Sequence, residues 1–202
     1  MTTNYMDFDI PRALKWLKKS LNSQRFIHSI GTMEQACELA RSFSENEQFA
    51  KIAGLMHDCA KCFNNEKLMQ IIKSQNLDVY ECELINYKTL HAPVSAYITK
   101  KEFGINNEPI LSAIRWHTLG KVDMTILEKI IFLSDKIEPK TRDADFRKKI
   151  YSILDQKNKI KALDEAILIC FEQTIKSLVD RKLKICHQTI DVYNMLLEKL
   201  EK

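Results

Sequence analysis

Six histidine and aspartate residues with the chemistry of metal ligands are spread through the first two thirds of the chain. They are His28, the adjacent His57 and Asp58, His91, His117 and Asp135. Divalent cations of the iron or manganese kind accept both imidazole nitrogens and carboxylate oxygens. Because metal sites in helical bundles are assembled from inward side chains on facing helices, we expect these residues to meet at one point in the fold.

Each of these residues also has an ordinary structural interpretation when it is taken singly. Neighbours in a helix point about 100° apart, so His57 and Asp58 can flank one cation only near a helix end. A histidine at a helix C-terminus followed by a surface aspartate would look the same. His117 lies on the inward stripe of its segment, where a core histidine bonded to a carbonyl is the alternative. The combination, rather than any one residue, carries the prediction.

Asp135 is harder to assign to structure alone. It follows Leu127 and Ile131 at spacings of four in the apolar segment ILEKIIFLSDKI, which places a carboxylate on a buried stripe. A buried carboxylate is costly unless a cation pairs with it. A lysine or arginine on a facing helix could be the cation that pairs with Asp135, and a metal ion is at least as good an explanation.

The elements that position these residues are predicted to be helices. The 202 residues include only four glycines and four prolines, which favours helices because sheets need turns. Apolar residues recur at spacings of three and four, and we expect one all-α domain over residues 1–202, with its core at about 24–140. Helices are expected at about 10–21, 24–44, 46–58, 65–75, 80–90, 91–104, 107–117, 124–137, 148–154, 161–181 and 187–201. The last three form the C-terminal helices, at about 148–201.

Charge and composition limit the partners and the location. A net charge of +4 is too small to favour a nucleic acid polymer but suits an anionic small molecule. The chain has no run of 18 apolar residues and no signal-peptide pattern, so we expect no membrane span and a cytoplasmic location.

In that location the six cysteines are expected to be reduced thiols. The C-x-x-C of Cys59 and Cys62 is expected to be structural, since no second pair and no β-α-β pattern accompany it.

The order H…HD…D of His28, His57, Asp58 and Asp135 resembles the HD-domain superfamily of metal-dependent phosphohydrolases. The additional His91 and His117 resemble the members of that superfamily that hold two metal ions. Further stretches are similar to the YqeK-type family of symmetrical bis(5′-nucleosyl)-tetraphosphatases. They are RFIHSIGTMEQACELA, AGLMHDCAK, HAPVSAYI, AIRWHTLGKVDMTILEKIIFLSDKIEP and HQTIDVYNML. The resemblance covers nearly the whole chain, from about residue 25 to 197.

This resemblance implies a single-domain HD helical bundle that cleaves diadenosine tetraphosphate into two ADP. It implies two divalent metal ions, iron in most family members and manganese as the alternative. The implied metal ligands are His28, His57, Asp58, His91, His117 and Asp135. The loop after IEP departs from the Pro-Gly turn that many members carry, and Arg142 is the residue there that carries over as a substrate contact. A nucleotide such as ADP or GDP is the implied product-like ligand, and a homodimer is left open.

The expected reaction is the attack of a metal-bound hydroxide on phosphorus, because two nearby cations acidify a shared water. Asp58 is expected to bridge the two ions, and Lys61 to contact a phosphate oxygen, although a solvated lysine is the ordinary alternative. Arg115 and Lys121, which bracket His117, are weaker candidates for phosphate contacts. Two alternatives stay open. One is another nucleotide-cleaving HD enzyme, either a nucleotidase or a guanosine tetraphosphate hydrolase, and the other is a non-catalytic, metal-bound nucleotide sensor.

Overall fold

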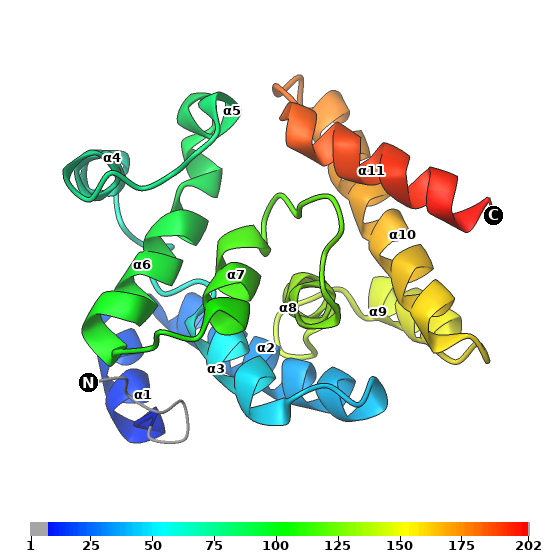
Figure 1. Cartoon of the computed structure of the whole chain (residues 1–202), viewed down its shortest axis with the longest axis horizontal. Coiled ribbons are helices and arrows are strands. Elements are labelled where there is room, and N and C mark those ends of the chain that lie inside the picture. Colours follow the sequence, from blue (N-terminus) through cyan, green and yellow to red (C-terminus); the bar gives the residue numbers. More distant parts are fainter. Residues whose placement is uncertain (1–7, 202) are drawn as a thin grey trace.

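The structure, a computed structural model, describes residues 8–201, and these residues form helices with no β-strand (Figure 1). This confirms the all-α prediction. The helices are α1 (Ile10–Ser20), α2 (Ser23–Ser42), α3 (Glu47–Met56), α4 (Asn65–Ser74), α5 (Glu81–Ile85), the short 3₁₀ helix η2 (Tyr87–Thr89), α6 (His91–Phe103), α7 (Glu108–Trp116), α8 (Ile126–Ile137), α9 (Ala144–Leu154), α10 (Lys159–Asp180) and α11 (His187–Leu200). Within the described residues, none of these helices has the length and apolarity needed to cross a membrane.

Short polar side chains determine where many of the helices begin. The side-chain oxygens of Asn22, Asn46, Asn64, Asn107 and Asn158 each accept a hydrogen bond from a backbone N–H in the first turn of the following helix. These bonds satisfy donors that a helix leaves unpaired at its start. Gly104, the last residue of the segment predicted at about 91–104, ends α6 in the left-handed conformation, with φ of 69°.

Helix α8 is the central element of the fold. It packs against α2, α3, α7 and α10, and Figure 1 shows it near the middle of the molecule, seen almost along its axis. Its residues are buried on nearly every side, including Ile130, Ile131 and Leu133. Phe132 stacks on Phe171 of α10 with ring centroids 4.8 Å apart. Asp135 on α8 is buried with them, with 6% of its surface exposed.

Helices α2 and α3 pack closely at Gly54. A Cβ atom on Gly54 would lie 3.0 Å from both the Cα atom of Met33 and the carbonyl oxygen of Thr32, which is tighter than ordinary packing. The absence of a side chain therefore lets the two backbones approach. The close packing brings the interior of α2, which carries His28, beside the end of α3, where His57 follows.

The C-terminal helices α10 and α11 run antiparallel along one side of the molecule (Figure 1). A buried carboxylate connects them to α8. The carboxylate of Asp164 on α10 forms ion pairs with Lys129 of α8 at 2.5 Å and with Lys199 of α11 at 2.6 Å. The three helices are therefore joined by charge as well as by apolar packing.

The expectation that all cysteines are reduced thiols is wrong for one pair. Cys82 of α5 and Cys186, the residue before α11, form a disulfide across 104 sequence positions. No sequence spacing marked this pair, because the fold brings two distant segments together. Cys59 and Cys62 are both free, and Cys59 is fully buried, in line with the structural role expected for it.

Candidate metal centre

The six predicted residues meet in the interior of the fold. His28 comes from α2, His57 and Asp58 from the end of α3, His91 from the start of α6, His117 from the end of α7 and Asp135 from α8. Each is buried, with at most 6% of its surface exposed. The imidazoles approach in two pairs. Nε2 of His28 lies 3.3 Å from Nε2 of His57, and Nε2 of His91 lies 3.1 Å from Nε2 of His117.

Asp58 lies between these two pairs and presents one carboxylate oxygen to each. Its Oδ1 lies 2.9 Å from Nε2 of His91 and 3.5 Å from Nε2 of His117. Its Oδ2 lies 3.7 Å from Nε2 of His57 and 3.9 Å from Nε2 of His28. The ligand atoms therefore form two groups that share one residue, Asp58 with His28 and His57, and Asp58 with His91 and His117.

The other ring nitrogen of three of these histidines is bonded to the local backbone. Nδ1 of His57, His91 and His117 lies 2.7 Å from the carbonyl oxygen three residues earlier, and each carbonyl can only accept. Nδ1 therefore carries the proton, and the lone pair of Nε2 points at the neighbouring ligand atoms. This bond to a second partner is what orients a histidine that ligates a metal.

His28 is oriented by a carboxylate instead. Its Nδ1 lies 2.9 Å from Oε1 of Glu138, which is itself fully buried and also accepts hydrogen bonds from Thr141 and from the backbone N–H of Lys140. On the opposite side, Nε2 of His28 lies 2.9 Å from Oδ1 of Asp135. Asp135 thereby joins the first group of ligand atoms.

Burial and charge keep the ligand atoms in the state that binds cations. Burial lowers the pKa of His57 to about 3 and the pKa of His91 to about 4, so both imidazoles are neutral near pH 7. Burial alone would raise the pKa of Asp58 and Asp135. Neighbouring His57 counters this at Asp58, and Lys136 counters it at Asp135, so the pKa of each carboxyl lies well below its usual range.

These residues fit a pair of divalent cations. With the proton on Nδ1, the Nε2 atoms of His91 and His117 are both acceptors, yet they lie 3.1 Å apart and face a carboxylate oxygen. Oδ1 of Asp58 accordingly makes no hydrogen bond of acceptable geometry, although it is buried. Acceptors brought together in this way need positive charge among them. Four imidazoles and two carboxylates are a suitable donor set for two ions of the iron or manganese kind.

Four cationic side chains surround the buried centre at its rim. They are Arg25, Lys61, Lys136 and Arg142, with between 25% and 36% of each side chain exposed. Each lies within 3.6 Å of a carboxylate oxygen of Asp58 or Asp135. A ligand that approaches the centre therefore meets positive charge first, which suits a polyanion.

The structure brings two of the four expected substrate contacts to this rim. Lys61 lies 3.1 Å from Nε2 of His91, and Arg142 donates to Oδ1 of Asp135 at 2.6 Å. The other two pair with carboxylates away from the six residues. Arg115 binds Glu83 at 2.6 Å, and Lys121 lies 2.8 Å from Glu128.

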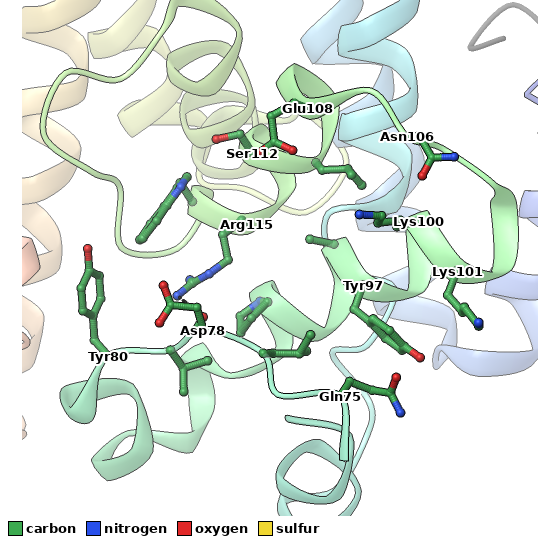
Figure 2. A pocket seen from close by; sticks show the side chains of 16 residues that line it. Gln75, Asp78, Tyr80, Tyr97, Lys100, Lys101, Asn106, Glu108, Ser112 and Arg115 are labelled. Carbon is green, nitrogen blue, oxygen red and sulfur yellow. Dashed lines mark hydrogen bonds between the residues drawn. The ribbon is translucent and has the colours of Figure 1, made fainter. Parts of the chain in front are cut away.

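Arg115 instead lines a separate cavity of about 690 Å³ between α6, α7 and the loop after α4 (Figure 2). Figure 2 shows Arg115 with Lys100 and Tyr97 on its walls. None of the six residues of the centre lines this cavity, although Pro93 and Trp116 on its wall are close in sequence to His91 and His117. The two sites therefore lie on different faces of the same helices.

Sequence reasoning missed the residues that support the centre, namely Arg25, Lys136, Glu138 and Thr141. Glu138 carries a usable signal, because it lies three residues after Asp135 and a turn of helix brings such positions to one side. Arg25 carries a similar sequence signal, since it precedes His28 by three residues in a helix. Whether either side chain meets a ligand depends on helix packing, which spacing does not reveal.

Comparison with known proteins identifies relatives that match most of the chain. The HD domain family matches residues 25–140. A protein of Bacillus subtilis named "Bis(5'-nucleosyl)-tetraphosphatase, symmetrical" is 34% identical over 187 residues, which cover 92% of this chain and 96% of the relative. A protein of the same name from Halalkalibacterium halodurans is 35% identical over the same shares of the two chains.

A solved structure has a similar fold. The crystal structure of a "predicted HD superfamily hydrolase involved in NAD metabolism" from Clostridium acetobutylicum superposes with a TM-score of 0.87. It is 33% identical, and the match covers 95% of this chain and 98% of that one. The helices and their order are therefore shared over almost the entire length.

Proposed function

Because the chain belongs to the HD domain family, we propose that it is a metal-dependent, symmetrical bis(5′-nucleosyl)-tetraphosphatase, a hydrolase that cleaves diadenosine tetraphosphate into two ADP. The observation that carries the proposal is the position of Asp58. Its two oxygens face two different pairs of imidazoles, so Asp58 would be a ligand for both cations. The activity itself rests on the named relatives, which match 92% of this chain.

The proposed metal ligands fall into two sets. His28, His57, Asp58 and Asp135 would hold one divalent cation, and Asp58, His91 and His117 would hold the other. Iron is the proposed metal and manganese the alternative, since both accept this mixture of nitrogen and oxygen ligands. When bound, two such cations supply Lewis-acid charge and acidify a shared water.

The protein's own side chains would bind and orient the polyphosphate. Lys61 lies 3.6 Å from Oδ1 of Asp58, and its partial exposure lets the ammonium also meet a phosphate oxygen. Arg142 donates from Nε to the carbonyl oxygen of Asp135 and from Nη2 to its Oδ1, and the Nη1 of Arg142 would donate to a phosphate oxygen. Arg25 and Lys136 add positive charge at the same rim. These four cations offset the repulsion between the substrate and the acidic ligands.

Product identity tests the proposal directly. Protein loaded with Fe²⁺ or Mn²⁺ should convert diadenosine tetraphosphate into ADP alone, and equal amounts of ATP and AMP would exclude symmetrical cleavage. Asp58→Ala should abolish turnover, while Asp180→Ala, which removes an exposed carboxylate at the end of α10, should leave it unchanged. Nucleotide binding without turnover by the wild-type protein would favour a sensor instead.

The proposal extends to the setting of the enzyme. Its substrates and products are small nucleotides, with ADP or GDP as a product-like ligand, and a nucleic acid polymer is not among its proposed partners. The cytoplasm is the proposed location, and a homodimer is the assembly to test. Sedimentation of the metal-loaded protein would distinguish a monomer from a dimer.

A further inference from the structure

A second cluster of metal-binding side chains lies outside the centre, where α5 faces the start of α11 (Figure 1). Cys82 of α5 and Cys186 are joined by the disulfide, with their Cα atoms 5.3 Å apart. His187 follows Cys186 as the first residue of α11. One ligand atom from each of the three residues lies within 4.8 Å of the other two. None of them belongs to the six residues of the centre.

Two cysteine sulfurs and an imidazole nitrogen are the donors that zinc prefers. Soft thiolates select zinc, and three protein ligands leave a fourth, tetrahedral position for water. Cys82 and Cys186 are half-buried and His187 is exposed, so water can reach that position. We propose that the reduced chain binds one zinc ion through Cys82, Cys186 and His187, and that the disulfide is the oxidised, metal-free state of the same site.

The surroundings favour the thiolate form that zinc needs. Cys186 is the N-cap residue of α11, a helix of 14 residues, and the positive end of a helix stabilises a nearby thiolate. The imidazole of His187 has no hydrogen bond or ion pair with any residue in the described part of the chain, so its nitrogens remain available. Tyr80 contacts it edge-on, with ring centroids 5.7 Å apart, and limits its orientation.

The two states interconvert by thiol–disulfide exchange with a low-molecular-weight thiol. Two such thiols reduce the Cys82–Cys186 bond, and they leave as one small disulfide while both cysteines become thiols. Zinc binding then releases the two thiol protons. In the reverse direction a small disulfide accepts two electrons and leaves as two thiolates, the protein sulfurs join, and the zinc ion is released. Both states keep α5 attached to α11.

The attachment of α5 to α11 also restrains the segment between Cys82 and His91, which leads to the centre. Glu83, next to Cys82, accepts two hydrogen bonds from Arg115 of α7 at 3.0 and 2.6 Å. The chain then continues through η2, where the carbonyl oxygen of Lys88 accepts the bond from His91. A zinc ion at the cluster would hold this segment against the C-terminal helices when the disulfide is absent.

Zinc content under two redox conditions tests the inference. The full-length protein is either reduced or left oxidised, freed of small thiols, loaded with Zn²⁺ and desalted, and its zinc per chain is measured. The reduced wild-type protein should hold one more zinc ion than the oxidised protein. Cys82→Ser combined with Cys186→Ser should remove that ion, and Cys62→Ser, which changes an exposed free thiol, should keep it.

Cobalt substitution separates this site from the centre. The six residues of the centre include no thiol, so a thiolate-to-cobalt charge-transfer band in the reduced protein can arise only from cysteine ligands. The band should appear in wild type and Cys62→Ser, and should be absent from the double variant. Equal zinc contents in the reduced and oxidised wild-type protein, or no thiolate band in the reduced one, would overturn the inference without reference to any variant's stability.

Discussion

Glu138 accepts the hydrogen bond from Nδ1 of His28 at 2.9 Å, whereas backbone carbonyls accept the corresponding bonds from His57, His91 and His117. A carboxylate partner makes an imidazole a stronger ligand and fixes its orientation. Glu138 is therefore a positioning residue for the cation that His28 would hold.

Glu138→Gln should weaken cation binding by about 10–100-fold, the usual effect of removing such a partner. The amide keeps the shape of the side chain but loses its charge. Competition with a chelator, followed by counting bound Mn²⁺, measures the change. Glu198→Gln on the exposed face of α11 is the matched control, and equal affinity in both variants would contradict a positioning role.

Gly31→Ala should produce a similar loss by displacing Glu138. A Cβ atom at Gly31 would collide with Oε2 of Glu138 and would lie 3.3 Å from Cγ of Lys140. Elsewhere in a helix the same change stabilises a protein by about 1 kcal/mol. Because both variants act on one contact, adding Gly31→Ala to Glu138→Gln should cost less than the sum of their separate effects. Additive losses in the chelator assay would show that the two residues act independently.

Lys61→Met should lower kcat/KM for diadenosine tetraphosphate by about 10–100-fold, the worth of one hydrogen bond to a charged group. The side chain is already partly exposed at the rim, so thermal stability should change little. Lys121→Met is the control, because Lys121 pairs with Glu128 away from the centre. Steady-state rates of ADP release measure both, and an equal loss in the two variants would indicate a general effect of charge.

Thiol reactivity should distinguish the free cysteines. Burial raises the pKa of Cys59 and Cys170 to about 12, so only about one in ten thousand of either is a thiolate at pH 8. Cys62 is exposed and should react first with a coloured disulfide reagent. The rapid phase should disappear in Cys62→Ser, and labelling of Cys59 and Cys170 should stay slow until the pH approaches 12 or the protein unfolds. Rapid labelling of Cys59 or Cys170 would contradict the packing.

Asp164→Asn should destabilise the fold by about 3–5 kcal/mol, because it leaves two lysines without the carboxylate that pairs with them. Most of this loss comes from Lys129, because only 9% of its side chain is exposed and water cannot replace the lost carboxylate. Denaturant unfolding measures the loss. Asp180→Asn is the control at an exposed position of the same helix, and binding of Mn²⁺ should be the same in all folded samples.

Local chemistry made most of the helices predictable. The scarcity of glycine and proline indicated helices, and the helix predicted at about 91–104 is α6, His91–Phe103. The second helix was predicted at about 24–44 and lies at Ser23–Ser42, because the cap at Asn22 acts one turn ahead of the apolar stripe. The segment at 80–90 breaks into α5 and η2, since Asn86 interrupts the regular backbone.

The site was predictable in part for a different reason. Residue types and order were enough to select His28, His57, Asp58, His91, His117 and Asp135, which the structure brings together. Their role as metal ligands stays a prediction. The pairing of Arg115 with Glu83 and the bond between Cys82 and Cys186 depend on how distant helices pack, and one sequence contains no record of that packing.

The hydrogen bonds of the histidines also set an order for assembly. His57, His91 and His117 are each oriented by a carbonyl three residues away, so a single helical turn is sufficient to aim them. His28 depends on Glu138, 110 positions along the chain, and that contact requires a long loop to close. During folding, the pocket formed by His91 and His117 should therefore become competent for a cation before the one that contains His28.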